Sequence, residues 1–275
     1  MPDTTKVELG KVQQTLFFPL LARARETQGK RPLLRDPKAL EVTQAVGMDF
    51  AAYPTPMRIL VVMRTMILDH WTRQFLAEHP SGTVVELGTG LNARFERADN
   101  GTAHWVDLDL PDTIELRRRF FTDTDRRRML AASLTDEDWL PEVEARPGPY
   151  LFTADGVLPY LTEEQVTGAL SRIAARFPGS RIAFDHYPRR VLEMEHKMAA
   201  KRDFAFWQWS CEDPRTLERY GLRLLETATA TRPPAGLRAT LPARHRYLLR
   251  LADPLLGSSG TLSLFQAAAG PAEKA

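Results

Sequence analysis

From residue 83 onward, short apolar runs alternate with stretches of helical pattern, and this alternation constrains the fold of the chain most strongly. The runs suited to strands are Thr83–Leu87, Ala103–Leu108, Met129–Ser133, Tyr150–Ala154, Arg181–Asp185, Leu222–Thr229 and Thr261–Ala267. Helical segments lie between them, notably Pro111–Phe121 and Glu163–Phe177. Strands that alternate with helices form a largely parallel sheet with helices on both faces. The sequence therefore predicts an α/β protein with a doubly wound, seven-stranded sheet.

The first 80 residues follow a different pattern, because their apolar side chains recur at helical spacing. Three helices are predicted there, over Lys11–Thr27, Pro37–Val46 and Pro56–Glu78. The third has apolar residues close to three and four positions apart, as on a packed helical face: Ile59, Val62, Met63, Met66, Ile67, Trp71 and Phe75. We therefore expect residues 1–80 to form a helical cap that covers the substrate, and residues 81–275 to form the domain that contains the sheet.

Two segments are longer than the connections of a minimal sheet of this kind. Residues 186–215 follow the fifth predicted strand and contain Tyr187, Trp207 and Trp209, while residues 232–258 follow the sixth. Insertions at the loop ends of an α/β sheet commonly build the substrate site. We expect both insertions to act as lids, although simple elaboration of the surface explains 232–258 equally well.

The overall charge is nearly balanced, with 37 Lys and Arg against 35 Asp and Glu and a net charge of +2. This balance gives no electrostatic reason to expect nucleic acid as a partner, and no run approaches the roughly 20 apolar residues that span a bilayer. The single cysteine, Cys211, fits a reducing compartment, and the histidines lack zinc-ligand spacing. We therefore predict a cytoplasmic protein that acts on a small molecule, without metal, nucleic acid or membrane. The oligomeric state stays open.

The most informative local motif joins the first predicted strand to a glycine-rich turn, in the sequence VVELGTGLNARF from Val84 to Phe95. Gly88 and Gly90 permit positive φ and close approach of the backbone to a ligand, which a ligand-cradling turn requires. Gly-x-Gly by itself is a weak signal, because ordinary tight turns use the same residues. The motif therefore needs support from its surroundings.

An acidic residue at the end of the next strand provides that support. Asp109, in WVDLDLP, comes 19 residues after Gly90, where a carboxylate can accept hydrogen bonds from both ribose hydroxyls of an adenosine cofactor. Asp107 projects to the same side of the strand by the two-residue period, so it competes for this role. The third glycine of the dinucleotide-binding G-x-G-x-x-G pattern is absent, with Ala93 in its place. This difference favours S-adenosylmethionine over NAD.

The stretch VELGTGLNARFERADNGTAHWVDLDLP resembles the leucine carboxyl methyltransferase superfamily, and more closely the bacterial polyketide O-methyltransferases of the tetracenomycin carboxyl methyltransferase type. The resemblance covers about residues 13–230 and includes TLFFPLLARARET, LLRDPKAL, MRTMILD, ADGVLPYLTEEQV and RFPGSRIAFDHYPR. It implies a class I methyltransferase sheet whose last two strands form an antiparallel pair at one edge. It also implies S-adenosylmethionine as the cofactor, bound within residues 81–275.

The resemblance assigns the family's cofactor contacts to positions in this chain. Arg35 and Arg64 correspond to binders of the methionine carboxylate, which an arginine fork matches well. Gly88 corresponds to a backbone contact, Asp109 to the ribose acid and Asp155 to the acid that holds the methionine amine. A solvated surface charge is a serious alternative for Arg35. Arg64 instead interrupts an apolar helical face, where a charge is costly unless it is paired.

Two positions depart from the family pattern. Asp155, in the sequence ADG, stands where the family usually has Glu, so the contact with the amine is lengthened or bridged by water. Ser133 and Leu134 stand where the family has an Asp-Leu pair beside adenine. Serine can accept a hydrogen bond from the adenine amino group but lacks the negative charge. We expect the adenine contact at these two residues to be weaker than in the family.

The acceptor side is less defined by the sequence. A carboxylate acceptor is already anionic and needs orientation and desolvation only, whereas a phenol, with a pKa of about 10, benefits from a general base. His186, just beyond the fifth strand, is the candidate base if the acceptor is a phenol, and a buried histidine bonded to the backbone is an equal alternative. Tyr187, Trp207 and Trp209 are candidates for the wall of an aromatic substrate site, or for packing.

Three functions fit these observations. The first is an S-adenosylmethionine-dependent O-methyltransferase that methylates a carboxylate, or a phenol, of a polyketide-type natural product, as in antibiotic biosynthesis. The second is a protein C-terminal carboxyl methyltransferase with the same fold and cofactor. The third is a cyclase or binding protein that retains the cofactor but transfers no methyl group. We favour the first, with a carboxylate as the acceptor.

Overall fold

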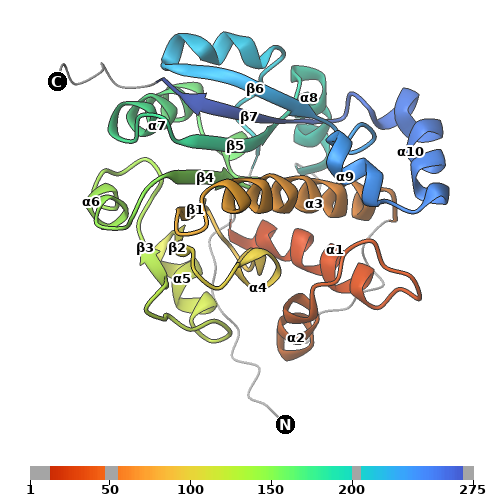
Figure 1. Cartoon of the computed structure of the whole chain (residues 1–275). Helices are drawn as coiled ribbons and strands as arrows, with labels where there is room; N and C mark the ends of the chain where they lie inside the picture. Colours follow the sequence, from red (N-terminus) through yellow and green to blue (C-terminus); the bar gives the residue numbers. More distant parts are fainter. Residues whose placement is uncertain (1–12, 47–54, 200–205, 269–275) are drawn as a thin grey trace.

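The computed structural model describes residues 13–46, 55–199 and 206–268, and it places the alternating segments in one seven-stranded sheet (Figure 1). The strands are β1 Thr83–Leu87, β2 His104–Asp109, β3 Arg127–Ala131, β4 Tyr150–Ala154, β5 Arg181–His186, β6 Leu222–Ala228 and β7 Thr261–Ala267. Their order across the sheet is β3-β2-β1-β4-β5-β7-β6. β1 to β5 are parallel, and β7 runs antiparallel to both β5 and β6. The predicted α/β sheet with an antiparallel edge pair is confirmed.

The helices flank this sheet (Figure 1). The α-helices are α1 Phe17–Thr27, α2 Pro37–Val46, α3 Thr55–Glu78, α4 Arg94–Ala98, α5 Pro111–Arg117, α6 Leu140–Glu144, α7 Glu163–Arg176, α8 Arg189–Ala199, α9 Ala235–Thr240 and α10 Ala243–Leu256. Short 3₁₀ helices occur at η1 Gln13–Leu16, η3 Leu158–Tyr160 and η4 Pro214–Tyr220. The helix predicted over Lys11–Thr27 therefore consists of η1 and α1, and Lys11 lies outside the described residues.

The two faces of the sheet belong to different hydrophobic clusters. In β1, Val85 packs in the cluster that contains Leu170 of α7, whereas Val84 packs in the cluster that contains Trp71 of α3. Successive side chains of a strand point to opposite faces, and a parallel sheet covered on both faces needs apolar residues on each. This is why the central strands read as continuous apolar runs rather than as alternating ones.

Helix α3 is part of the main core. Its residues Ile67, Trp71 and Phe75 are almost fully buried and share a cluster with Leu151 of β4 and Ala183 of β5. In contrast, α1 and α2 pack with α5 and the turn after β1 in a separate cluster. The described part of residues 1–80 is therefore largely helical, and its longest helix covers one face of the sheet directly.

A buried arginine joins α3, α4 and the central strands. Arg94 of α4 is fully buried, and its Nε donates to Asp69 of α3 at 2.9 Å. Its Nη1 donates to Glu86 of β1 at 3.2 Å and to Thr153 of β4 at 3.2 Å, and its Nη2 donates to Asp155 at 3.0 Å. Burial alone would raise the pKa of Asp69, but Arg97 and Arg94 outweigh it and hold that pKa at about 2. One guanidinium thus neutralises carboxylates from three elements.

Among the described residues, no helix is long and apolar enough to cross a membrane. The same part of the chain contains no group of three or more His, Cys, Asp and Glu side chains arranged to hold a metal ion.

Replacing Arg94 with Met should lower the free energy of unfolding by about 3–5 kcal/mol, because Asp69, Glu86 and Asp155 would lose a buried counter-charge. Arg176 provides a matched control, since it also links two helices through a carboxylate, Glu144, at 2.6 Å but on the surface. Arg176→Met should leave the urea midpoint almost unchanged. Equal shifts of the two midpoints would show that burial of the network does not matter.

Candidate active site

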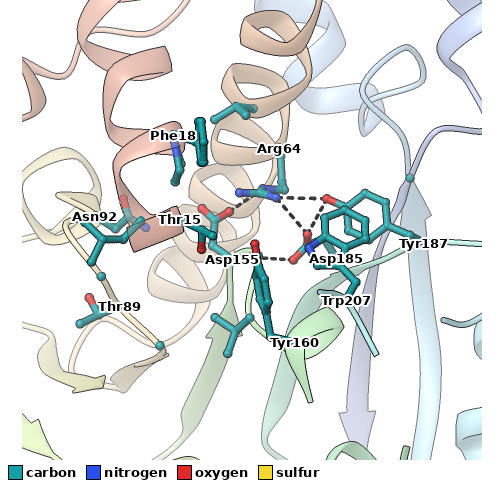
Figure 2. A pocket seen from close by; sticks show the side chains of 18 of the residues that line it. Thr15, Phe18, Arg64, Thr89, Asn92, Asp155, Tyr160, Asp185, Tyr187 and Trp207 are labelled. Atoms are coloured by element: carbon teal, nitrogen blue, oxygen red, sulfur yellow. Dashed lines mark hydrogen bonds and ion pairs between the residues drawn. The ribbon is translucent and has the colours of Figure 1, made fainter. Parts of the chain in front are cut away.

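A cavity of about 610 Å³ opens beyond the carboxyl ends of the parallel strands (Figure 2). Ligands of open α/β sheets bind at this edge, and the volume lies within the range of small-molecule sites. Its lining comes from the turn after β1, the ends of β2, β4 and β5, the loop after β3, and helices α1, α3 and α8. Segments far apart in the sequence therefore meet around one space.

The glycine turn after β1 forms part of the cavity lining. Gly88 has a φ of 64° and Gly90 a φ of 50°, a backbone conformation that residues with a side chain rarely adopt. A Cβ atom added at Gly88 would lie 2.5 Å from Cγ2 of Val157, which follows β4. The turn therefore needs glycine at this position both for its backbone angles and for its contact with the neighbouring loop.

The two aspartates of β2 differ in position, because one lines the cavity and the other lies in the core. Asp109 lies at the strand end and lines the cavity, and its carboxylate accepts hydrogen bonds from the backbone N–H of Gly90 at 2.6 Å and of Leu110 at 2.7 Å. Burial raises the pKa of Asp109 although these N–H groups and Arg117 act against it. Asp107 is fully buried, accepts from Arg117 at 3.0 Å and from Arg127 at 2.7 Å, and does not line the cavity. Of the two, only Asp109 is placed to meet a ligand.

The two predicted contacts for the methionine carboxylate also differ in position. Arg64 lines the cavity, whereas Arg35 is exposed and is not part of the lining. Arg23 of α1 lines the cavity instead, with its Nε on Asp36 at 2.9 Å and its Nη2 on the carbonyl of Leu91 at 2.9 Å. The sequence pattern alone had not indicated Arg23, although this arginine interrupts a buried helical face in the same way as Arg64.

Arg64 of α3 forms ion pairs with two carboxylates at the strand ends (Figure 2). Its Nε lies 2.6 Å from Oδ1 of Asp155, and its Nη1 lies 3.1 Å from Oδ2 of Asp185. Burial opposes the charge of Arg64, but Asp155 and Asp185 overcome this and raise its pKa well above the ordinary value. The arginine therefore stays charged beside the cavity, as a carboxylate-binding residue must.

Asp155 is the acid that sequence reasoning placed after the fourth strand. Burial raises its pKa, but Arg64 and Arg94 more than compensate, so the pKa lies below the ordinary value and the carboxylate is ionised. Although Nε of Arg64 lies close to Oδ1 of Asp155, both atoms are buried without an aligned hydrogen bond. The pair is therefore held at close range by opposite charge, and both side chains keep some exposure, 14% for Arg64 and 10% for Asp155.

Ser133 and Leu134 line the cavity on its other side, in the loop that follows β3. The hydroxyl groups of Ser133 and Thr135 lie 2.7 Å apart, and Leu134 is buried. The strand itself ends at Ala131, two residues earlier than the sequence predicted. Both residues therefore lie where the resemblance places the adenine contact, on a loop rather than at the end of a strand.

Aromatic side chains form the end of the cavity near β5. The rings of Tyr187 and Trp207 are 4.3 Å apart, and Tyr160 meets Trp207 edge to face at 6.3 Å. Met194 and Met198 of α8 add apolar lining and are about half exposed. Trp209 does not reach this wall, because it is buried in the core against Phe184. Tyr187 and Trp207, but not Trp209, are thus placed to contact an acceptor.

His186 does not line the cavity. It is buried, with Nδ1 3.1 Å from the carbonyl oxygen of Cys211 and Nε2 2.9 Å from the hydroxyl of Ser263. Burial lowers its pKa, against smaller opposite effects of the Cys211 carbonyl and nearby carboxylates. Both ring nitrogens are thus used in hydrogen bonds that tie β5 to β7 and to the segment around Cys211. This position does not fit the role of general base that the sequence suggested for a phenol acceptor.

The two insertions contribute unequally. The described part of 186–215 supplies Tyr187, Val191, Met194, Glu195, Met198 and Trp207 to the lining. The segment 232–258, which forms α9 and α10, supplies none of the described lining residues. Only the first insertion therefore builds the acceptor end, while the second packs beside α3 through Leu241 and Leu249.

These residues fit a cofactor with an adenosine end and an amino acid end. The carboxylate of Asp109 suits ribose hydroxyls, and the pair of Arg64 and Asp155 suits a carboxylate and an ammonium group. Both members of that pair line the cavity. The glycine turn lines the same cavity and allows the backbone to come close to such a molecule.

Comparison with known proteins supports this interpretation. The sequence model of the leucine carboxyl methyltransferase family matches residues 17–174. The tetracenomycin polyketide synthesis O-methyltransferase TcmP of Streptomyces glaucescens is 37% identical over 227 residues, covering 80% of this chain and 83% of its own. The S-adenosyl-L-methionine-dependent methyltransferase dpfgK of Gibberella zeae is 27% identical over 250 residues, covering 82% of this chain and 84% of its own.

The fold itself is shared with solved methyltransferases. Magnesium protoporphyrin IX methyltransferase (ChlM) of Synechocystis PCC 6803, solved with bound S-adenosylhomocysteine, matches with a TM-score of 0.52 at 12% identity. The match covers 83% of this chain and 94% of that chain. The predicted class I methyltransferase fold and the predicted cofactor, S-adenosylmethionine, are confirmed.

Asp109→Ala should raise the Kd for S-adenosylmethionine by about 10- to 100-fold, because one hydrogen bond to a charged acceptor contributes on the order of 1.5–3 kcal/mol. Calorimetric titration measures this change directly. Asp125→Ala, which removes an exposed carboxylate outside the cavity, serves as the control. An unchanged Kd in Asp109→Ala would remove Asp109 from the ribose site.

Arg64→Met should weaken cofactor binding much more than Arg35→Met, because Arg64 lines the cavity and Arg35 is exposed. Since the first change leaves two buried carboxylates with less counter-charge, Arg64→Lys is measured beside it. Lysine keeps the charge but loses the bidentate fork, so an intermediate loss is expected. Equal losses for Arg35→Met and Arg64→Met would refute this ranking by position.

Proposed function

We propose that this chain, which belongs to the leucine carboxyl methyltransferase family, is an O-methyltransferase that acts on a small natural product of polyketide type. The methyl donor is S-adenosylmethionine. The observation that carries the proposal is the composition of the cavity, which joins a charged end suited to the cofactor with an aromatic and apolar end. The identity of 37% with a polyketide O-methyltransferase supports the same class of acceptor.

When bound, S-adenosylmethionine supplies an electrophilic methyl group on a sulfonium centre. The chain's own contribution is to hold an acceptor oxygen in line with that methyl group and to keep water away from it. Tyr187 and Trp207 offer ring contacts for an aromatic acceptor, and Met194 and Met198 offer adaptable apolar contacts. Such a surface suits a planar, largely apolar molecule.

We favour a carboxylate as the acceptor group. A carboxylate is ionised near neutral pH and needs no base, and the only histidine that the sequence offered as a base, His186, is bonded within the core. The carboxylates that line the cavity are compatible with this choice, because each already has a partner in the protein. Asp155 and Asp185 are paired with Arg64, and Asp109 and Glu195 accept hydrogen bonds from backbone N–H groups. Desolvation between apolar side chains then suffices to make the acceptor reactive.

One probe can separate the alternatives. The compound 3-hydroxy-2-naphthoate carries a carboxylate and a phenol on one planar system, so mass spectrometry of the product distinguishes a methyl ester from a methyl ether. A peptide that ends in leucine is tested in parallel with the same methyl-labelled cofactor, as is an extract of polyketide metabolites. We expect the ester or a labelled metabolite. Methylation of the peptide alone would favour a protein carboxyl methyltransferase, and binding of the cofactor without any transfer would refute the proposal.

His186→Gln should retain turnover within a few-fold of the wild-type rate from about pH 6 to 9, because glutamine can keep hydrogen bonds to Cys211 and Ser263. If His186 were a general base, its loss would instead cost about 10²- to 10⁴-fold and remove a limb of the pH–rate profile. Rate measurements with the acceptor found above decide this. A large loss that recovers at high pH would make a phenol the better acceptor.

A further inference from the structure

The two carboxylates beside Arg64 differ in their partners and in their exposure. Asp155 follows β4 and Asp185 is the penultimate residue of β5, so they come from neighbouring strands and meet the same guanidinium (Figure 2). The sequence pattern indicated a role for Asp155 but none for Asp185. The contacts of each carboxylate show which side of the site it acts on.

Both oxygens of Asp185 accept hydrogen bonds from within the protein. It is 1% exposed, and its Oδ1 accepts a hydrogen bond from the backbone N–H of Gly156 at 2.7 Å. Its Oδ2 accepts from the hydroxyl of Tyr187 at 2.8 Å and from Nη1 of Arg64 at 3.1 Å. All of these donors belong to the protein, and they come from the turn after β4, the end of β5 and helix α3.

Asp155 presents more of its side chain to the cavity. Its Oδ2 accepts from Nη2 of Arg94 at 3.0 Å, and its Oδ1 lies 2.6 Å from Nε of Arg64 in an ion pair. The side chain of Asp155 is 10% exposed, against 2% for that of Asp185. Asp155 is therefore the more accessible of the two carboxylates to a ligand in the cavity.

Tyr187 connects Asp185 to the acceptor end of the cavity, because its hydroxyl is bonded to Asp185 and its ring lines the cavity. Its hydroxyl donates to Asp185 and accepts from Nη1 of Arg64 at 3.1 Å, which fixes its direction. Burial and the adjacent Asp185 raise the pKa of Tyr187, although Arg64 opposes them, so the hydroxyl remains protonated and keeps its bond. The ring then lies 4.3 Å from that of Trp207 and lines the cavity.

A glycine makes this arrangement possible. Gly156, between the two strands, has a φ of 75°, and a Cβ atom there would lie 2.9 Å from Nη2 of Arg64. The guanidinium can therefore lie directly against the turn that donates to Asp185. Backbone and side chains together hold Arg64 and Tyr187 in one place.

We infer that the two carboxylates have different roles in the site. Asp155 acts on the cofactor side, and Asp185 is a positioning residue for the acceptor side. Asp185 holds Tyr187 and Arg64 so that the wall formed by Tyr187 and Trp207 is ready for a planar acceptor. This inference rests on the proposed function for the nature of the acceptor. Its division of roles can nevertheless be tested by binding alone.

Three variants test the division, each close in shape to the native residue. Asp155→Asn should raise the Kd for S-adenosylmethionine by at least about 10-fold, the effect of one lost hydrogen bond to a charged group. Asp185→Asn should raise that Kd by no more than about 3-fold, well below the loss of such a bond. Asp185→Asn should instead raise the Kd of 3-hydroxy-2-naphthoate, titrated with S-adenosylhomocysteine present, by at least about 10-fold.

Tyr187→Phe keeps the ring beside Trp207 but removes the hydroxyl that Asp185 holds. It should weaken naphthoate binding with little effect on cofactor binding, and combining it with Asp185→Asn should add little, because the two changes interrupt the same interaction. A purely structural role for Asp185 would lower the thermal midpoint and weaken both ligands to the same extent. If Asp185→Asn does not fold, Tyr187→Phe alone carries the acceptor-side test.

The outcomes separate this inference from the proposed function. Similar cofactor losses in Asp155→Asn and Asp185→Asn would overturn the division of roles, as would multiplicative losses in the double variant. If the wild-type chain does not bind the naphthoate, the planar acceptor is refuted, and the two cofactor Kd values still decide the division. If the division holds but no methyl group is transferred to any acceptor, the proposed function fails and the geometric inference stands.

Discussion

The strand-end edge of the sheet depends on buried arginines that neutralise the carboxylates gathered there. Glu86 and Asp107 lie side by side in the register of β1 and β2, both buried, and would repel each other without counter-charges. Arg94 and Arg117 provide these charges from the helices that follow β1 and β2. A buried ion pair adds little net stability, but removing one partner is costly. The network therefore fixes where the helices dock more than it adds to overall stability.

The same electrostatics extend to the cavity. Arg94 reaches Asp155, which Arg64 also contacts, and Arg64 in turn contacts Asp185. Charges that hold the fold together thus also position the groups that face a ligand. An ionised carboxylate in a buried place is possible only because these cations are supplied. The turns and strand ends of this part of the cavity are therefore held in place by cations from helices α3 and α4.

The aromatic end of the cavity has a different physical character. It is formed by aromatic rings and by the methionines of α8, which are 53% and 41% exposed at Met194 and Met198. Methionine is flexible and polarisable, so it adapts to ligands of different shape. One end of the cavity is charged and held by ion pairs, and the other is apolar and adaptable. This contrast suits the proposed pairing of a charged cofactor with an apolar acceptor.

Much of the fold was predictable because its signals are local. The strands are short apolar runs between helical patterns, and all seven are found with boundary shifts of at most a few residues. The cofactor turn was predictable because Gly88 and Asp109 occupy fixed positions after their strands. The choice between Asp107 and Asp109 was not, since both lie on the same side of β2. Only their distance from the strand end places one of them in the core and the other in the cavity.

The sequence by itself determined the α/β class, the helical N-terminal segment, the glycine turn and the family, because each depends on periodicity or on residues close together in the chain. Tertiary structure decided which polar and aromatic residues meet. It placed Asp185 rather than His186 at the cavity, Trp207 rather than Trp209, and Arg23 rather than Arg35. In each case the two residues are of the same type or are adjacent in the chain. They differ in the direction of the side chain and in the partners that distant segments bring to it, which local pattern does not encode.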